Sequence, residues 1–176
     1  MCSNQQYVCR TFIDAVEEGC MFHLQECYNR GDDINFRNPD RESLSPLHAA
    51  ALYDNIQFVQ FLIERGADLD SLDCYGNTPL GVGVVENSSV EVLSMLVNAG
   101  SNIHHKNEDG DTALHLASRF GYQNIINFLV GCGADIQTVN NEGETPINIA
   151  DENMPAGFIQ DCFDQQSYDI KEPDSF

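Results

Sequence analysis

The chain has 176 residues, of which 42% are hydrophobic, so it is long enough for one domain with a continuous apolar core. Its 28 acidic and 8 basic residues give a net charge of −20, which repels phosphate backbones and anionic lipid and argues against nucleic-acid and membrane partners. The sequence has no apolar run long enough to span a membrane, and its first residues lack the pattern of a signal peptide or a myristoylation site. The seven cysteines have no disulfide spacing and are typical of reduced thiols. We therefore expect a protein of the cytoplasm, or of the cytoplasm and nucleus.

In chain order, we expect a leader at residues 1–9, one helical domain at residues 10–165 and an acidic flexible tail at residues 166–176. The domain divides into five units of a short first helix, a break and a second helix, at approximately 10–37, 40–72, 73–106, 107–139 and 140–165. The unit at 107–139 is the clearest: Thr112 can cap a helix, Gly121 interrupts it, and a second apolar helix ends at Gly133. Neither helix is long enough to be stable alone.

Two motifs recur in phase along the chain. The first is Ser45-Pro46-Leu47-His48, which returns at Thr78, Thr112 and Thr145, in steps of 33, 34 and 33 residues. The second is a Gly-Ala-Asp-Leu type of sequence that begins at Gly66, Gly100 and Gly133. A period of 33 residues with this first motif resembles the ankyrin repeat. The resemblance implies an all-α solenoid of helix-turn-helix units joined by β-turn or hairpin loops, and a non-enzymatic role in protein binding.

Three repeats depart from the pattern. The first lacks the Thr-Pro-Leu-His motif and is expected to be a divergent cap. The third has Gly81 and Gly83 in its first helix and an insertion at Ser88-Ser89; since two glycines cost about 1–2 kcal/mol in helix propensity, we expect this to be the weakest repeat. The last changes at Met154-Pro155, and its second helix would contain Phe158, Ile159, Cys162 and Phe163.

The residue types that can carry chemistry are few. His48 and His115 occupy a fixed position of the motif, where the resemblance implies a hydrogen-bonding role within and between repeats. Cys20, His23 and Cys27 lie at i, i+3 and i+7, so a thiol- or metal-dependent site on one helix face is an alternative, although no fourth ligand is evident. The sequence has no phosphate-binding loop and no nucleophile motif. We expect no enzyme activity, catalytic residue, metal or cofactor.

Proteins that resemble this one commonly grip a partner with the loop tips before each first helix and with exposed first-helix residues. At these positions the chain has acidic residues with a few aromatic and aliphatic ones, a composition typical of interface anchors in a polar surround. We define the predicted partner surface as Arg41, Glu42, Leu44, Leu52, Tyr53, Tyr75, Asn77, Glu86, Glu108, Asp111, Arg119, Phe120, Glu142 and Glu144. Its acidity predicts a protein partner with a basic segment, bound by a monomer.

The resemblance implies two further points. Some ankyrin proteins are hydroxylated on the residue that follows the Ala-Asp-Ile pattern, a position held here by Asn35, Asp70, His104 and Gln137. The usual asparagine and the usual leucine eight residues earlier never coincide, so this is a weaker hypothesis. A module that masks a basic segment also resembles inhibitors of Rel-type transcription factors and of cyclin-dependent kinases, and the repeats by themselves do not choose between them.

Overall fold

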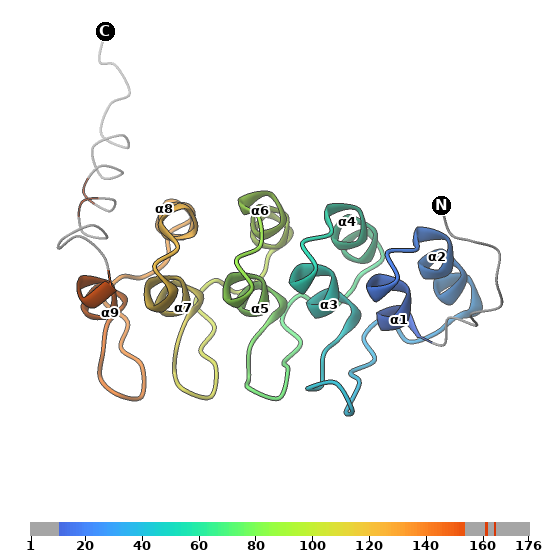
Figure 1. Ribbon diagram of the computed structural model, residues 1–176, viewed down its shortest axis with the longest axis horizontal. Coiled ribbons are helices and arrows are strands. Elements are labelled where there is room, and N and C mark those ends of the chain that lie inside the picture. The colour runs from blue at the N-terminus through green and yellow to red at the C-terminus, as the bar shows by residue number, and fades with distance from the viewer. Residues whose placement is uncertain (1–10, 154–160, 162–163, 165–176) are drawn as a thin grey trace, which may run out of the picture. The chain divides into compact units, whose positions relative to one another are not determined.

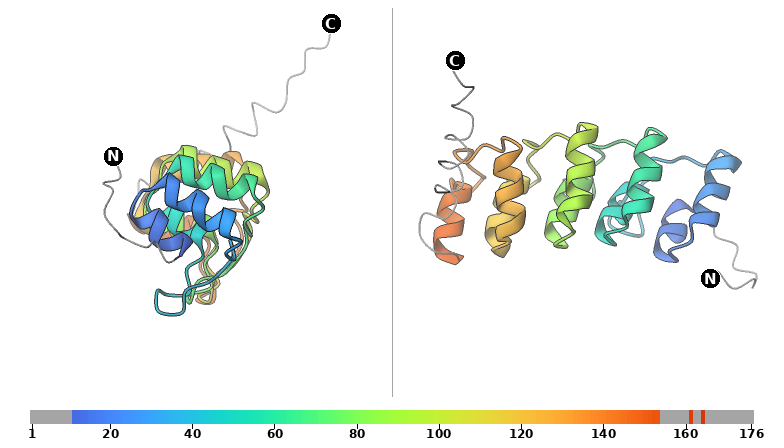
Figure 2. Two further views of the ribbon diagram at one scale, coloured as in Figure 1. Left: turned by 90° about the vertical axis from the view of Figure 1, so that its right-hand side faces the viewer. Right: turned by 90° about the horizontal axis from the view of Figure 1, so that it is seen from above.

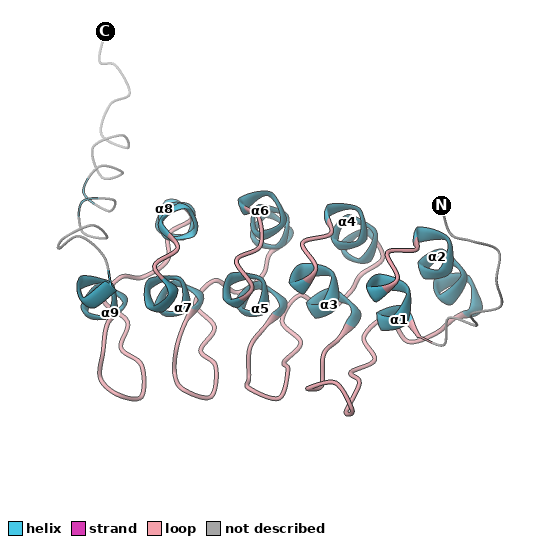
Figure 3. Cartoon of the chain, in the orientation of Figure 1, coloured by secondary structure: helices cyan, strands magenta, loops and turns pink. Residues whose placement is uncertain are grey.

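The computed structural model describes residues 11–153, together with residues 161 and 164. Regular structure in this part of the chain is helical, and its only bridge of β type is an isolated antiparallel pair, Asn38 with Leu44 (Figure 3). No helix in it is long and apolar enough to cross a membrane. The expected leader, the tail and the expected second helix with Phe158 and Ile159 fall outside the described residues. The chain divides between Ser101 and Asn102 into two units, which we describe separately.

The first unit contains the first three repeats, each with a short first helix and a second helix of the opposite layer. The first helices pack side by side in one layer and the second helices in another, with the connecting hairpin loops projecting beyond the layer of first helices (Figures 1 and 2). The helices are α1 (Phe12–Glu17), α2 (Met21–Arg30), α3 (Pro46–Leu52), α4 (Ile56–Glu64), α5 (Pro79–Val85) and α6 (Val90–Ala99).

The second unit, taken by itself, contains α7 (Ala113–Phe120), α8 (Gln123–Gly131) and α9 (Pro146–Asn153). Helix α7 packs against both α8 and α9. The all-α fold of helix-turn-helix repeats predicted from the sequence is thus confirmed.

Local sequence sets where each first helix begins. Ser45 and Thr78 hold extended backbone angles at the N-cap, and their hydroxyl oxygens accept the N–H of the residue three positions on. Such caps satisfy amide groups that have no partner inside the helix. A proline follows each cap, where its fixed φ suits a first turn and its missing N–H costs nothing. The same positions at Thr11 and Thr112 begin α1 and α7 without a proline.

The core lies between the two layers and between neighbouring repeats. Its leucines are at most 1% exposed, as in Leu24, Leu47, Leu62, Leu80, Leu93, Leu114 and Leu129. Full burial of one such side chain stabilises the fold by about 1.5–3 kcal/mol. Ala49, Ala50 and Ala51 are also buried, because α3 packs closely against α1 and α5.

The motif histidines are buried links between a first helix and the following hairpin loop. His48 Nδ1 accepts the Ser45 N–H at 3.1 Å, so Nε2 carries the proton and donates to the Asn77 carbonyl at 3.0 Å. In the second unit, His115 accepts from the Thr112 N–H at 3.1 Å and donates to the Glu144 carbonyl at 3.1 Å. The structural interpretation of both histidines is therefore confirmed, since neither ring has a nitrogen left for catalysis.

Gly83 of the third repeat is explained by packing. A Cβ on Gly83 would lie 2.9 Å from Leu93 Cδ2 and 3.6 Å from Ala51 Cβ, so the absent side chain lets α5 approach both neighbours. The inserted serines add links to the second repeat: Ser88 Oγ donates to the Ala51 carbonyl at 2.7 Å, and Ser89 donates to the Asp54 carboxylate. These contacts join the third repeat to the second, and its lower stability stays a prediction.

We predict that His48→Ala lowers the free energy of unfolding by about 2–4 kcal/mol, because it opens a cavity and removes the acceptor of the Ser45 N–H. Urea unfolding followed by circular dichroism measures the change. His104→Ala is the matched control: His104 is exposed, so its loss is expected to cost less than about 0.5 kcal/mol. Equal effects of the two substitutions would contradict the structural role of His48.

Burial lowers the pKa of His48 below its ordinary 6.5, since the charged ring is poorly solvated. Well above pH 6.5 the ring is neutral in the folded and unfolded chain alike. As the pH falls below this value, the unfolded chain binds a proton that the folded chain does not, so stability decreases. We expect His48→Gln to remove about 1 kcal/mol of the stability difference between pH 7.5 and pH 5.5. Urea unfolding of both proteins at the two pH values measures it, and identical pH dependence would contradict the prediction.

Candidate functional site

The loop tips of the first unit are held by contacts between hairpin loops and with α1. Arg41 forms ion pairs with Glu17 and Asp14 of α1. The Cys74 N–H of the next loop donates to the Glu42 carbonyl at 2.8 Å. Glu42 and Ser43 both have left-handed backbone angles, with φ of 52° and 57°, at the tip where the later loops have glycine. Left-handed conformation costs a non-glycine residue about 1–2 kcal/mol. The ion pairs of Arg41 and the hydrogen bond between Cys74 and Glu42 must therefore be strong enough to hold the tip in this conformation.

Acidic and aromatic side chains meet at this pair of loops. Tyr75 is 55% exposed, and the Glu42 carboxylate raises the pKa of its phenol, chiefly through charge and also through a hydrogen bond. Tyr53, the C-cap residue after α3, is 51% exposed, and Glu86 after α5 is exposed too. Arg41, Leu44 and Leu52 are half-buried. The first unit thus presents carboxylates with two tyrosines among them.

In the second unit, Phe120 at the end of α7 is 47% exposed and stacks on Tyr122, with ring centroids 5.5 Å apart. Gly121, with φ of 69°, turns the chain between the two rings. Tyr122 was not part of the predicted partner surface. The sequence Phe-Gly-Tyr at a helix end could have predicted that its ring lies beside that of Phe120. Glu108 and Glu142 are exposed at the loop tips, and Glu144 is half-buried.

Two residues of the predicted partner surface are buried and belong to the scaffold. Asn77 is 9% exposed: its N–H donates to Asp73 Oδ1 at 2.8 Å, and its carbonyl accepts from His48. Asp111 is 3% exposed, and its carboxylate accepts from Asn140 at 2.9 Å and from Arg119 at 2.8 Å. Their prediction as partner contacts is wrong, because both side chains are buried at the base of a hairpin loop, where they bond polar side chains of their own unit instead of facing solvent.

Every basic side chain that the structure describes is engaged inside its own unit. Arg30, Arg41, Arg65 and Arg119 pair with carboxylates, while Arg37 donates to the Leu72 carbonyl and Lys106 to the Val139 carbonyl. Arg65 also lies over the rings of Phe61 and Tyr28. The acidic residues are in large excess, so the exposed carboxylates at the loop tips have few cations to neutralise them.

The structure separates the residues of the alternative metal or thiol site. Cys20 and Cys27 are buried, at 2% and 0% exposure, and burial raises the pKa of the Cys27 thiol. His23 instead lies 3.0 Å from Glu18. No group of three potential ligands that could hold a metal ion occurs in the described part of the chain. A site at these three residues is therefore not supported, since helical spacing alone does not make side chains converge.

The four candidate hydroxylation positions are all exposed, and Asn35 has a structural partner. Its Oδ1 accepts the Asp68 N–H at 2.8 Å, which links the first hairpin loop to the second. Asp70, His104 and Gln137 occupy equivalent loop positions. Hydroxylation of any of them stays a prediction, which mass spectrometry of protein from its native cell would test.

Comparison with known proteins identifies the repeats. The family model for ankyrin repeats (3 copies) matches residues 12–107 and 83–159. Relatives include the putative ankyrin repeat protein FPV031 of Fowlpox virus, 36% identical over 110 residues, and the B-cell lymphoma 3 protein of Homo sapiens, 32% identical over 122 residues. These alignments cover 61% and 68% of this chain but only 29% and 24% of the two relatives. The likeness therefore concerns the repeats and not the whole of either relative.

We predict that Asp111→Ala lowers the free energy of unfolding by about 2–3 kcal/mol, because it leaves Asn140 and Arg119 without their shared acceptor. Glu108→Ala in the same loop is the control, with an expected change below about 0.5 kcal/mol, since Glu108 is exposed. Urea unfolding of both variants makes the comparison. A larger loss of unfolding free energy in Glu108→Ala than in Asp111→Ala would contradict the assignment of Asp111 to the scaffold and of Glu108 to the surface.

Proposed function

The chain belongs to the ankyrin repeat family, and we propose that it is a non-enzymatic protein-interaction module that binds a basic segment of a partner protein. The family as a whole supports protein binding by the repeats. The basic partner segment is our inference from the charge of this chain. Because fold alone does not determine function, the argument depends on the exposed residues of these particular loops.

The observation that carries the proposal is the internal use of the basic side chains. The six that the structure describes contact carboxylates or carbonyls of their own unit. Exposed carboxylates such as Glu42, Glu86, Glu108 and Glu142 then set the potential around the loop tips. A basic segment would be attracted by this potential and would associate quickly, whereas an acidic one would be repelled.

Exposed aromatic rings supply the second element of the proposed interface. Tyr53 and Tyr75 in the first unit, and Phe120 in the second, are each about half exposed. Aromatic side chains bury a large apolar area at little entropic cost, so they dominate the binding energy of many interfaces. In this proposal the carboxylates guide the partner and the rings anchor it.

We further propose that the monomer acts in the cytoplasm or nucleus by masking the basic segment. A Rel-type transcription factor and a cyclin-dependent kinase are the two kinds of partner that the sequence resemblance suggested. Identification of the captured protein by mass spectrometry distinguishes them.

The test is affinity capture from the native cell with wild-type protein and with Tyr53→Ala/Phe120→Ala, at low and high salt. We expect the double variant to bind its partner at least about tenfold more weakly. High salt is also expected to weaken binding, because it screens the exposed carboxylates. Phe22→Ala is the matched control, since Phe22 is an aromatic residue 66% exposed on the second helix α2, away from the loop tips.

Two results would contradict the proposal. Capture that is unchanged by both the double variant and salt would exclude an acidic surface with aromatic anchors. Loss of the partner with Phe22→Ala, but not with the double variant, would show that the interface lies on the second helices.

A further inference from the structure

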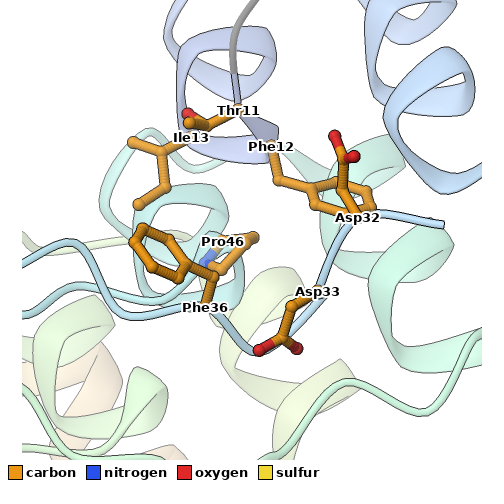
Figure 4. Close-up of a pocket in the computed structure, with 7 residues that line it drawn as sticks. All are labelled: Thr11, Phe12, Ile13, Asp32, Asp33, Phe36 and Pro46. Atoms are coloured by element: carbon orange, nitrogen blue, oxygen red, sulfur yellow. The ribbon is translucent and has the colours of Figure 1, made fainter. Parts of the chain in front are cut away.

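The first repeat has a pocket that lies outside the interface proposed above. It lies in the first unit at the N-terminal end of α1 and has a volume of about 260 Å³. Phe12, Ile13, Phe36 and Pro46 give it apolar walls, and the carboxylates of Asp32 and Asp33 lie at its edge (Figure 4). None of these residues belongs to the predicted partner surface.

Comparison with the second repeat explains why the pocket occurs here. Residue Phe36 occupies the position of Ser71 in the following loop. Ser71 is 9% exposed, and its hydroxyl contacts the Ser45 hydroxyl at 3.1 Å, which joins the loop to the start of α3. Phe36 has no hydroxyl for such a bond and remains 48% exposed. The first repeat therefore has a large apolar wall where the second has a small, buried polar contact.

The size of the pocket indicates what can enter it. Sites that enclose a whole small molecule usually measure roughly 300–1,000 Å³, so this pocket suits a single large side chain. Its walls are mostly apolar, and a side chain that stacked on Phe36 would remove the exposed ring face from water. An aromatic ring satisfies both requirements.

The edge of the pocket indicates the charge of the occupant. Asp32 is neutralised by Arg30, but no basic side chain in the described part of the chain pairs with Asp33. Asp33 is exposed, and its Oδ1 accepts the Asn35 N–H at 2.9 Å, which fixes the carboxylate beside the pocket. A cationic side chain would complement it.

We propose that this pocket binds one aromatic side chain of an extended partner segment, with a neighbouring lysine or arginine placed against Asp33. The residues that line this site differ from the exposed rings Tyr53, Tyr75 and Phe120, and the site does not depend on those rings. The proposal requires the partner to have an aromatic residue with an adjacent basic residue.

The experiment is an NMR titration of the full ¹⁵N-labelled chain with the capped hexapeptide Lys-Gly-Phe-Lys-Gly-Lys. We expect amide shifts at Asp33, Ile34, Asn35 and Phe36, which adjoin the pocket. Replacement of the peptide's phenylalanine by alanine should abolish these shifts, and replacement of its lysines by glutamate should do the same. NMR suits the titration, because a hexapeptide with a single anchor is expected to bind weakly.

Variants of the protein locate the site. Phe36→Ser introduces the residue type that the second repeat carries at this position, and it should weaken peptide binding at least tenfold. Asp33→Asn leaves the fold unperturbed at an exposed position and should weaken binding about threefold at low salt. Phe22→Ser, which removes an exposed phenylalanine of α2, is the control and should leave binding unchanged.

Four outcomes would overturn the proposal. Wild-type protein that shows no shifts would exclude the site, as would full affinity in both Phe36→Ser and Asp33→Asn. Binding that is lost in Tyr53→Ala/Phe120→Ala, but kept in Phe36→Ser, would assign the peptide to the acidic loop tips; this rejects the pocket and supports the proposed function. Binding that requires removal of residues 1–10 would make that segment of the chain the occupant instead of a partner.

Discussion

A two-helix repeat of this chain is too thin to have an interior of its own, so each repeat stays folded only by covering the apolar face of the next. Leu47 and Leu80 are 1% exposed because neighbouring helices enclose them. The buried His48 gives this stacking a fixed geometry, since its Nε2 N–H reaches the Asn77 carbonyl of the following loop. Because the base of this loop is held by His48, and that of the last loop by His115, their tips can carry residues that are not needed for stacking.

The same division between base and tip explains the distribution of charge. Asp73, Asp111 and Asn140 satisfy backbone and side-chain groups at the loop bases and are buried. The basic residues are also used internally, as in the pair of Arg119 with Asp111. What remains for solvent at the tips is therefore mainly carboxylate and aromatic. The negative potential at the surface therefore has two causes. Acidic residues outnumber basic ones, and the few basic side chains are paired within the fold.

The first repeat differs because Asp14 stands where the second has His48. Its carboxylate accepts from Thr11 Oγ1 at 3.0 Å and lies near Arg41 of the next loop, so an ion pair replaces the histidine link between repeats. Phe36 then lacks the polar partner that Ser71 has in the second repeat. The departure from the repeat motif thus accompanies the ion pairs of Arg41 with α1 and the apolar pocket of the first repeat.

The sequence by itself determined the repeat period and the short helices of each repeat, because both depend on short-range patterns of caps, turns and apolar spacing. The all-α solenoid and the role of the motif histidines came from the resemblance to ankyrin repeats that this period revealed. The sequence also identified Tyr53, Tyr75 and Phe120 as exposed. Only the tertiary structure decided that Asn77 and Asp111 are buried, that Cys20, His23 and Cys27 do not converge, and that Gly83 makes room for Leu93. These outcomes depend on which groups of adjacent repeats meet, and residue type at a loop position does not reveal whether a carboxylate faces water or an amide of the neighbouring repeat.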